Sequence, residues 1–121
     1  MDGYTSDEIS QALPPIASLM SKSQKAQLKL APGTWQHSML QDNLTALRIA
    51  SALLDATPGD APAPTCDELR ATLGTFDSMI GRVEGVKTKF AEGTSQHTLQ
   101  RNRLKALRIA QAAVRAELAK P

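Results

Sequence analysis

Apolar residues recur every three or four positions through most of the chain, the spacing that places side chains on one face of an α-helix. The pattern is clearest between residues 65 and 90, where alternating steps of four and three are interrupted only at Lys87: Leu69, Leu73, Phe76, Ile80, Val83 and Phe90. Residues 35–55 carry a broader apolar arc, over more than a third of a helical circumference. The pattern therefore predicts an all-α protein.

The chain also repeats itself at a spacing of sixty residues. The segment GTWQHSMLQDNLTALRIA at 33–50 returns as GTSQHTLQRNRLKALRIA at 93–110, and the two halves align without a gap. A fixed period is typical of a duplicated supersecondary unit. We expect a single helical domain over 1–121, composed of repeat unit one at 5–55, a Pro/Ala linker at 56–64 and repeat unit two at 65–119.

Local signals place the helix starts in each unit. Thr5 is followed three residues later by Glu8, and Thr65 by Glu68. This spacing is that of a capping box, in which the threonine side chain and the glutamate side chain each accept a hydrogen bond from the other residue's backbone N–H. We therefore expect the first helix of each unit to begin directly after these threonines.

The repeated GT segment predicts a turn followed by a second helix. Ala31-Pro32-Gly33-Thr34 fits a type II turn, because proline fixes φ and glycine accepts a positive φ. Thr34 and Thr94 then become N-caps, and His37 and His97 occupy the third helical position, where a neutral imidazole could complete the cap. Much of the repeated segment is thus interpreted as a hinge between paired helices.

The two pairs of helices are expected to pack face to face as a four-helix bundle of two αα-hairpins related by a pseudo-twofold axis. The alternative is two separate hairpins that each complete a core with another copy of the chain. Pro14 and Pro15 predict a break or sharp kink in the first helix, with Gly74 at the matching place in unit two. Gly81 and Gly85 are interpreted as close-packing positions.

Composition narrows the class of protein. Of 121 residues, 41% are hydrophobic and only 3% aromatic, which fits an aliphatic helical core. No apolar run approaches the roughly 20 residues that span a bilayer, and the N-terminus lacks a signal-peptide pattern, so we expect a cytoplasmic protein without membrane contact. Cys66 is the single cysteine, which excludes an internal disulfide, and we expect it to be partly buried.

Charge differs between the halves. The net charge of +2 combines −2 over residues 1–60 with +4 over residues 61–121. Arg101, Lys105, Arg108 and Arg115 fall in one sector of the last helix, a stripe that could follow nucleic-acid phosphates. The alternative is an ordinary solvated face, which the small net charge and the lack of aromatic residues in the stripe favour.

A second candidate is the helix edge that carries a histidine and an arginine in both units. His37 and Arg48, like His97 and Arg108, return to one face at helical spacing, so they could form two equivalent anion sites. Alternatively, the arginines pair with a carboxylate of a neighbouring helix, such as Asp7 or Glu8.

Trp35 is the conspicuous difference between the repeats, since Ser95 matches it. It either covers the hinge of its own helix pair or anchors a partner protein, because tryptophan is enriched at binding hot spots.

No motif for catalysis or metal binding accompanies these edges. Neither histidine follows a Glu-x-x-His pattern, and no HExxH, GxSxG or phosphate-cradling glycine loop occurs, so no metal, cofactor or catalytic residue is assigned.

The repeated segment resembles repeats in small bacterial proteins, which implies no activity. The leading hypothesis is a non-catalytic protein-interaction module, self-association included. The alternative is a nucleic-acid or anionic-ligand binder, and a small enzyme comes third.

Overall fold

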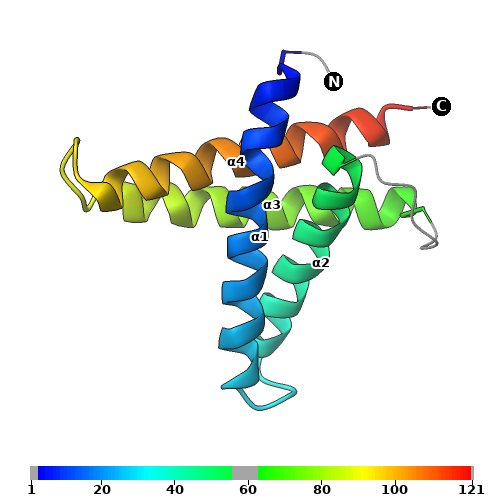
Figure 1. Cartoon of the computed structure of the whole chain (residues 1–121). Coiled ribbons are helices and arrows are strands. Elements are labelled where there is room, and N and C mark those ends of the chain that lie inside the picture. Colours follow the sequence, from blue (N-terminus) through cyan, green and yellow to red (C-terminus); the bar gives the residue numbers. More distant parts are fainter. Residues whose placement is uncertain (1–2, 56–62, 121) are drawn as a thin grey trace.

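The computed structural model describes residues 3–55 and 63–120, which form four α-helices: α1 (Ser6–Leu28), α2 (Trp35–Asp55), α3 (Cys66–Lys87) and α4 (Ser95–Leu118) (Figure 1). No strand occurs among these residues. The all-α prediction is confirmed. Most of the linker predicted at 56–64 lies outside the described residues.

Short-range hydrogen bonds define the start of α1 and α3. The Oγ1 of Thr5 accepts from the backbone N–H of Glu8 at 3.1 Å, and Oε1 of Glu8 accepts from the backbone N–H of Thr5 at 3.1 Å. Thr65 and Glu68 repeat both bonds at the same distances. Each capping box satisfies N–H groups that have no partner within the helix, so it holds the start of its helix in place.

The turns before α2 and α4 have the expected backbone. Gly33 has φ of 92° and Gly93 has φ of 86°, both in the region that favours glycine. The backbone N–H of Thr34 donates to the carbonyl of Ala31 at 3.3 Å, which closes the turn, and Thr94 makes the same bond to Ala91. The threonine side chains then accept from the N–H of the third helical residue. These bonds reverse the chain between neighbouring helices.

Of the break or sharp kink predicted at Pro14 and Pro15, the break is wrong, because α1 runs without interruption from Ser6 to Leu28, and the kink stays a prediction. Proline has no N–H, so the carbonyls of Ser10 and Gln11 lose their usual donors. Both residues are exposed, so water can hydrate these carbonyls. Burial of Ala12 and Ile16 on either side of the prolines compensates for part of the cost. Likewise, α3 continues through Gly74.

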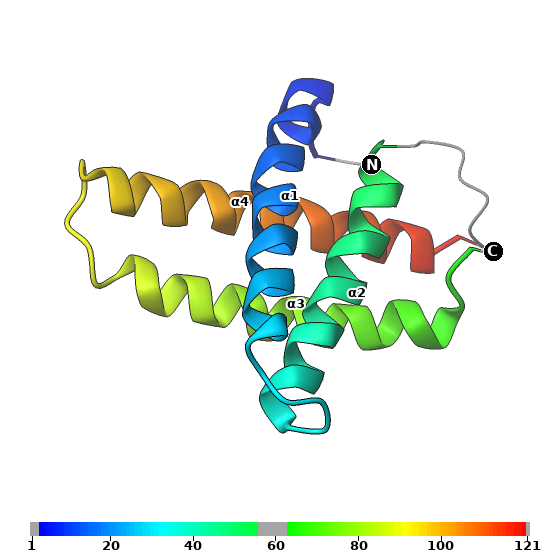
Figure 2. The same ribbon diagram turned by 60° about the horizontal axis from the view of Figure 1, so that its bottom comes forward.

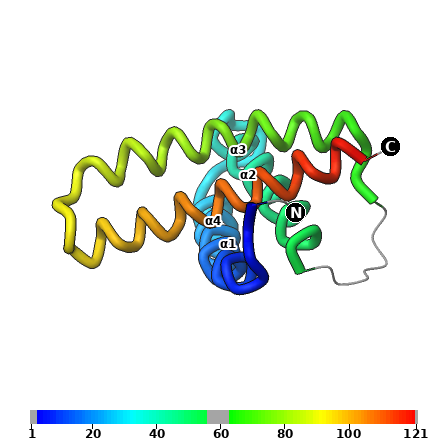
Figure 3. Tube along the Cα trace, turned by 90° about the horizontal axis from the view of Figure 1, so that it is seen from above, coloured from blue at the N-terminus to red at the C-terminus, as the bar shows by residue number. Residues whose placement is uncertain are grey.

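The helices are arranged as two pairs that cross. α1 packs along α2, and α3 packs along α4 (Figures 1 and 2). Viewed from above, α3 and α4 run lengthwise in the plane of the picture, whereas α1 and α2 are seen nearly end-on (Figure 3). We call α1 with α2 the first helix pair and α3 with α4 the second helix pair. The pairs lie across each other instead of alongside, a relative orientation within the four-helix arrangement that the sequence prediction did not specify.

Contacts between the pairs come from three helix combinations: α1 with α4, α2 with α4, and α2 with α3. α2 and α4 therefore each contact all three other helices, and α4 buries the most residues of the four. The core shared by the two pairs includes four alanines that are at most 1% exposed: Ala46, Ala50, Ala106 and Ala110. Small side chains let helix axes approach closely, and these four alanines are the two alanines of each ALRIA segment.

Gly81 and Gly85 are not close-packing positions. A Cβ atom added at either glycine would meet no other group within 4 Å. Both residues are exposed on α3. The absence of a side chain at these places is therefore not required by a neighbouring helix.

Candidate functional site

Trp35 lies at the first position of α2 and is 70% exposed. Its indole therefore does not cover the hinge of its own helix pair, which was one of the two predicted roles. The side chain lines a hollow of about 390 Å³ between α2 and α3, together with Ser38, Met39, Asp42, Asn43, Thr75, Ser78 and Arg82. A large aromatic group at the rim of a groove remains available to a partner.

This hollow continues into a second one along the same two helices. The second hollow, of about 330 Å³, shares Asp42 and Thr75 with the first and adds residues such as Ile49 and Thr72. We call the two hollows together the α2–α3 groove. It combines apolar surface from Trp35, Met39 and Ile49 with the charged groups of Asp42, Arg82 and Glu68.

The histidines lie where the sequence predicted, at the third position of α2 and of α4, and both are partly buried. Their imidazoles make no hydrogen bond within the described residues. The N–H that an imidazole cap would have satisfied, that of Thr34, donates to Ala31 instead. The histidines are therefore not the capping groups of these helices.

The predicted His–Arg edges stay a prediction as anion sites, since residues eleven positions apart on a helix are not expected to bond each other directly. No hydrogen bond or ion pair joins His37 to Arg48 or His97 to Arg108 in the described part of the chain. Arg48 is exposed, and no ion pair to it is found among the described residues. Arg108 donates from Nη2 to Oε1 of Glu84 on α3 at 2.7 Å, so its carboxylate partner is neither Asp7 nor Glu8.

Cations from α4 gather beside the start of α1. Arg101, Lys105 and Arg108 line a hollow of about 320 Å³ with Tyr4, Lys87 and Leu104. We call it the basic cavity. Of the predicted stripe, Arg115 does not line it. The structure thus joins three residues of the predicted stripe, Arg101, Lys105 and Arg108, with two that the sequence analysis did not single out as binding residues, Tyr4 and Lys87.

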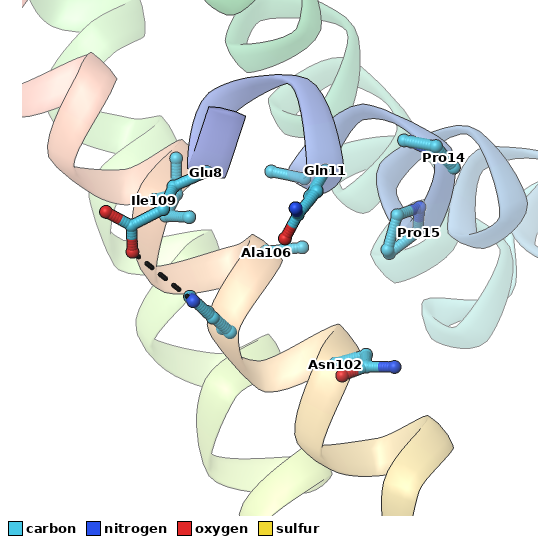
Figure 4. A pocket seen from close by; sticks show the side chains of 9 residues that line it. Glu8, Gln11, Pro14, Pro15, Asn102, Ala106 and Ile109 are labelled. Carbon is cyan, nitrogen blue, oxygen red and sulfur yellow. Dashed lines mark ion pairs between the residues drawn. The ribbon is translucent and has the colours of Figure 1, made fainter. Parts of the chain in front are cut away.

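A second cavity, of about 330 Å³, lies where α1 crosses α4, and Lys105 lines both cavities. Figure 4 shows Glu8, Gln11 and the two prolines of α1 opposite Asn102, Ala106 and Ile109 of α4. The dashed line marks the ion pair between Oε2 of Glu8 and Nζ of Lys105, 3.3 Å apart. This pair connects the two helix pairs at the edge of the crossing.

The pKa of Glu8 is lowered from its usual value of 4.5. The largest cause is the hydrogen bond from the Thr5 backbone, followed by the hydrogen bond from the Lys105 side chain, while desolvation acts in the opposite direction. Both favourable contacts stabilise the ionised carboxylate. Glu8 is therefore ionised at neutral pH and compensates one positive charge beside the basic cavity.

The described residues contain neither a cluster of metal-ligating side chains nor a buried thiol. No set of three or more His, Cys, Asp or Glu side chains could hold a metal ion there. Cys66 is exposed at the first position of α3, contrary to the expected partial burial, because its side chain lies outside the apolar face of the helix. None of the helices in the described ranges has the length and apolarity to cross a membrane.

Comparisons with protein-family models, curated proteins and solved structures found no match to this chain.

Proposed function

We propose that this protein is a non-catalytic interaction module that binds a partner protein through the α2–α3 groove. The observation that carries the proposal is the 70% exposure of Trp35 at the rim of that groove. Tryptophan is rare on surfaces that remain in water and is enriched where proteins bind one another.

The shape of the groove supports a segment of polypeptide as the bound group. Its two hollows lie end to end because they share Asp42 and Thr75. A segment lying along them would place apolar side chains against Trp35, Met39 and Ile49. Asp42 and Arg82 would fix its orientation through polar contacts, as isolated charged groups do in apolar binding surfaces.

Capture with immobilised protein tests the proposal. The informative variant is Trp35→Ser, since Ser95 occupies the equivalent first position of α4 and is tolerated there. We expect the partner to bind this variant at least about tenfold more weakly, because loss of a tryptophan hot spot costs roughly 2 kcal/mol or more. Leu99→Ser is the matched control, as it removes an exposed apolar side chain of α4 that does not line the groove.

A second variant separates binding to the groove from general adhesion. Thr75→Arg places a long side chain at one of the two residues that both hollows share. The purified partner should bind this variant more weakly than it binds the wild-type protein. Trp35 is the single tryptophan, and the partner should shift its fluorescence in the wild-type protein but not in the variant. Equal capture by Trp35→Ser, Thr75→Arg and wild type would refute the proposal. Fluorescence changes that depend on concentration without any partner would identify a second copy of the chain as the occupant.

We further propose that the two helix pairs are copies of one ancestral αα-hairpin, related by an approximate twofold axis. Matched capping boxes, the matched turns at Gly33 and Gly93, and the buried alanines of both ALRIA segments support this origin. An ancestor of this kind would have paired with a second copy of itself, and the fused chain retains that pairing internally.

Nucleic-acid binding by α4 has weaker support. Two of the four cations in the predicted stripe, Lys105 and Arg108, already pair with Glu8 and Glu84. A duplex needs a continuous row of free cations along its phosphates. The arrangement of cations suits a compact anion better than a polymer.

A further inference from the structure

The basic cavity is separate from the α2–α3 groove and shares no lining residue with it. Tyr4 precedes α1, Lys87 ends α3, and the other lining residues come from α4: Arg101, Leu104, Lys105 and Arg108. Four of the six lining side chains are therefore cationic at neutral pH. Three separate elements bring them together.

The cations are only partly neutralised by the protein itself. Glu8 pairs with Lys105, and Glu84 pairs with Arg108. Lys87 and Arg101 make no ion pair in the described part of the chain. The cavity with its two carboxylates therefore has an excess of two positive charges, contributed by Lys87 and Arg101.

In the first helix pair, the positions that correspond to Lys87 and Arg101 are occupied by neutral residues. Gln27 and Gln41 stand sixty residues before Lys87 and Arg101. There, Nε2 of Gln27 donates to Oε1 of Gln41 at 3.0 Å and reaches the carbonyl of His37 at 3.4 Å. The two positions thus face each other across neighbouring helices. In the second helix pair, a hydrogen-bonded neutral pair has been replaced by two like charges, which repel each other unless an anion lies between them.

We propose that the basic cavity binds a phosphate group, with Lys87 and Arg101 as its principal ligands. The guanidinium of Arg101 can donate two parallel hydrogen bonds to phosphate oxygens, and the ammonium of Lys87 supplies a point charge. Tyr4 also lines the cavity, and its hydroxyl can add a neutral donor. A doubly charged group matches the excess of two positive charges. The phosphate can be free or part of a small phosphorylated molecule, since both present the same oxygens.

Calorimetric titration of the full chain at low ionic strength tests this site, with inorganic phosphate, pyrophosphate and a sugar phosphate as separate probes. The decisive variant is Lys87→Gln combined with Arg101→Gln, which recreates the Gln27–Gln41 pair in the second helix pair. We expect this variant to unfold at the same temperature as wild type or higher, because it gains a hydrogen bond and loses a repulsion. Its affinity for the best probe should fall about tenfold or more, as two charge-assisted contacts are lost.

Arg115→Gln is the control, because it removes an exposed cation of α4 that does not line the cavity. It should change the affinity less than about twofold. Tighter binding of the sugar phosphate than of inorganic phosphate would identify a phosphorylated molecule as the ligand. Equal losses in Arg115→Gln and the double variant would overturn the proposal, as would no binding of any probe at about 10 mM. A short DNA duplex that binds more tightly than pyrophosphate and depends equally on Arg115 would instead assign the surface to nucleic acid.

Discussion

The carboxylate of Glu8 makes two contacts at once, one with its own helix cap and one with Lys105 of the other helix pair. Oε1 accepts from the backbone N–H of Thr5 at 3.1 Å, and Oε2 lies 3.3 Å from Nζ of Lys105. One side chain therefore secures the start of α1 and connects that start to α4. Its counterpart Glu68 makes the cap contact alone, since no ion pair to Glu68 exists in the described residues.

Replacement of Glu8 by glutamine should lower stability in a pH-dependent manner. The pKa of Glu8 is lowered in the folded protein, so its ionised form stabilises the fold above its unfolded value near 4.5. That contribution is lost as the pH falls through the still lower folded pKa. We expect Glu8→Gln to melt below wild type at neutral pH and to approach it in acid, as followed by circular dichroism.

Comparison of Glu8→Gln with Glu68→Gln isolates the contribution of the ion pair between Glu8 and Lys105. Glutamine can also complete a capping box, so both variants retain the cap and only Glu8→Gln loses an ion pair. The difference between the two variants should shrink in high salt, because the ion pair is on the surface. Identical melting of the two variants at neutral pH would show that the contact with Lys105 contributes nothing.

Enlarging a buried alanine at the crossing should destabilise the fold. Ala50 and Ala110 are both 0% exposed and belong to the core that the two helix pairs share. Leucine at either position would force the helices apart, at a cost of about 1–3 kcal/mol in the free energy of unfolding. Ala52→Leu is the control on an exposed position of α2 and should change stability by no more than about 0.5 kcal/mol. Urea unfolding of the three variants measures the difference, and equal midpoints would contradict the crossing.

Two glycines should respond to alanine in opposite directions. Gly93 has φ of 86°, so Gly93→Ala should cost about 1–2 kcal/mol because alanine disfavours the left-handed region. Gly74 lies within α3, and an added Cβ would meet no other group within 4 Å. Gly74→Ala should therefore raise stability by about 0.5–1 kcal/mol. Thermal unfolding checks both, and a loss of stability in Gly74→Ala would argue against a continuous α3.

Helix caps and turns could be predicted without the structure, because they depend on interactions between residues close in sequence. The capping boxes at Thr5 and Thr65 and the turns at Gly33 and Gly93 involve hydrogen bonds between residues three or four positions apart. The prolines of α1 were misjudged because local propensity predicts a break, whereas burial of Ala12 and Ile16 against the rest of the core keeps the helix intact.

The candidate sites were predictable only in part. Arg101 and Arg108 stand out in the sequence as part of a basic stripe, and Trp35 as a difference between the repeats. In the sequence Lys87 interrupts an apolar seam, and alignment with Gln27 reveals a change from amide to cation at that position. Tyr4 carries no comparable signal, since it enters the basic cavity only through the position of α1 on α4.

The sequence by itself determined four amphipathic helices, their ends and the turns between neighbours, because backbone hydrogen bonds and side-chain periodicity act over short separations. Only the tertiary structure decided that the helix pairs cross and that α4 contacts every other helix. It also decided that Lys105 forms an ion pair with Glu8 and that Lys87 and Arg101 line the same cavity. These relationships depend on how apolar faces of similar composition pack against one another, and the periodicity of a single helix does not specify the angle at which two such faces meet.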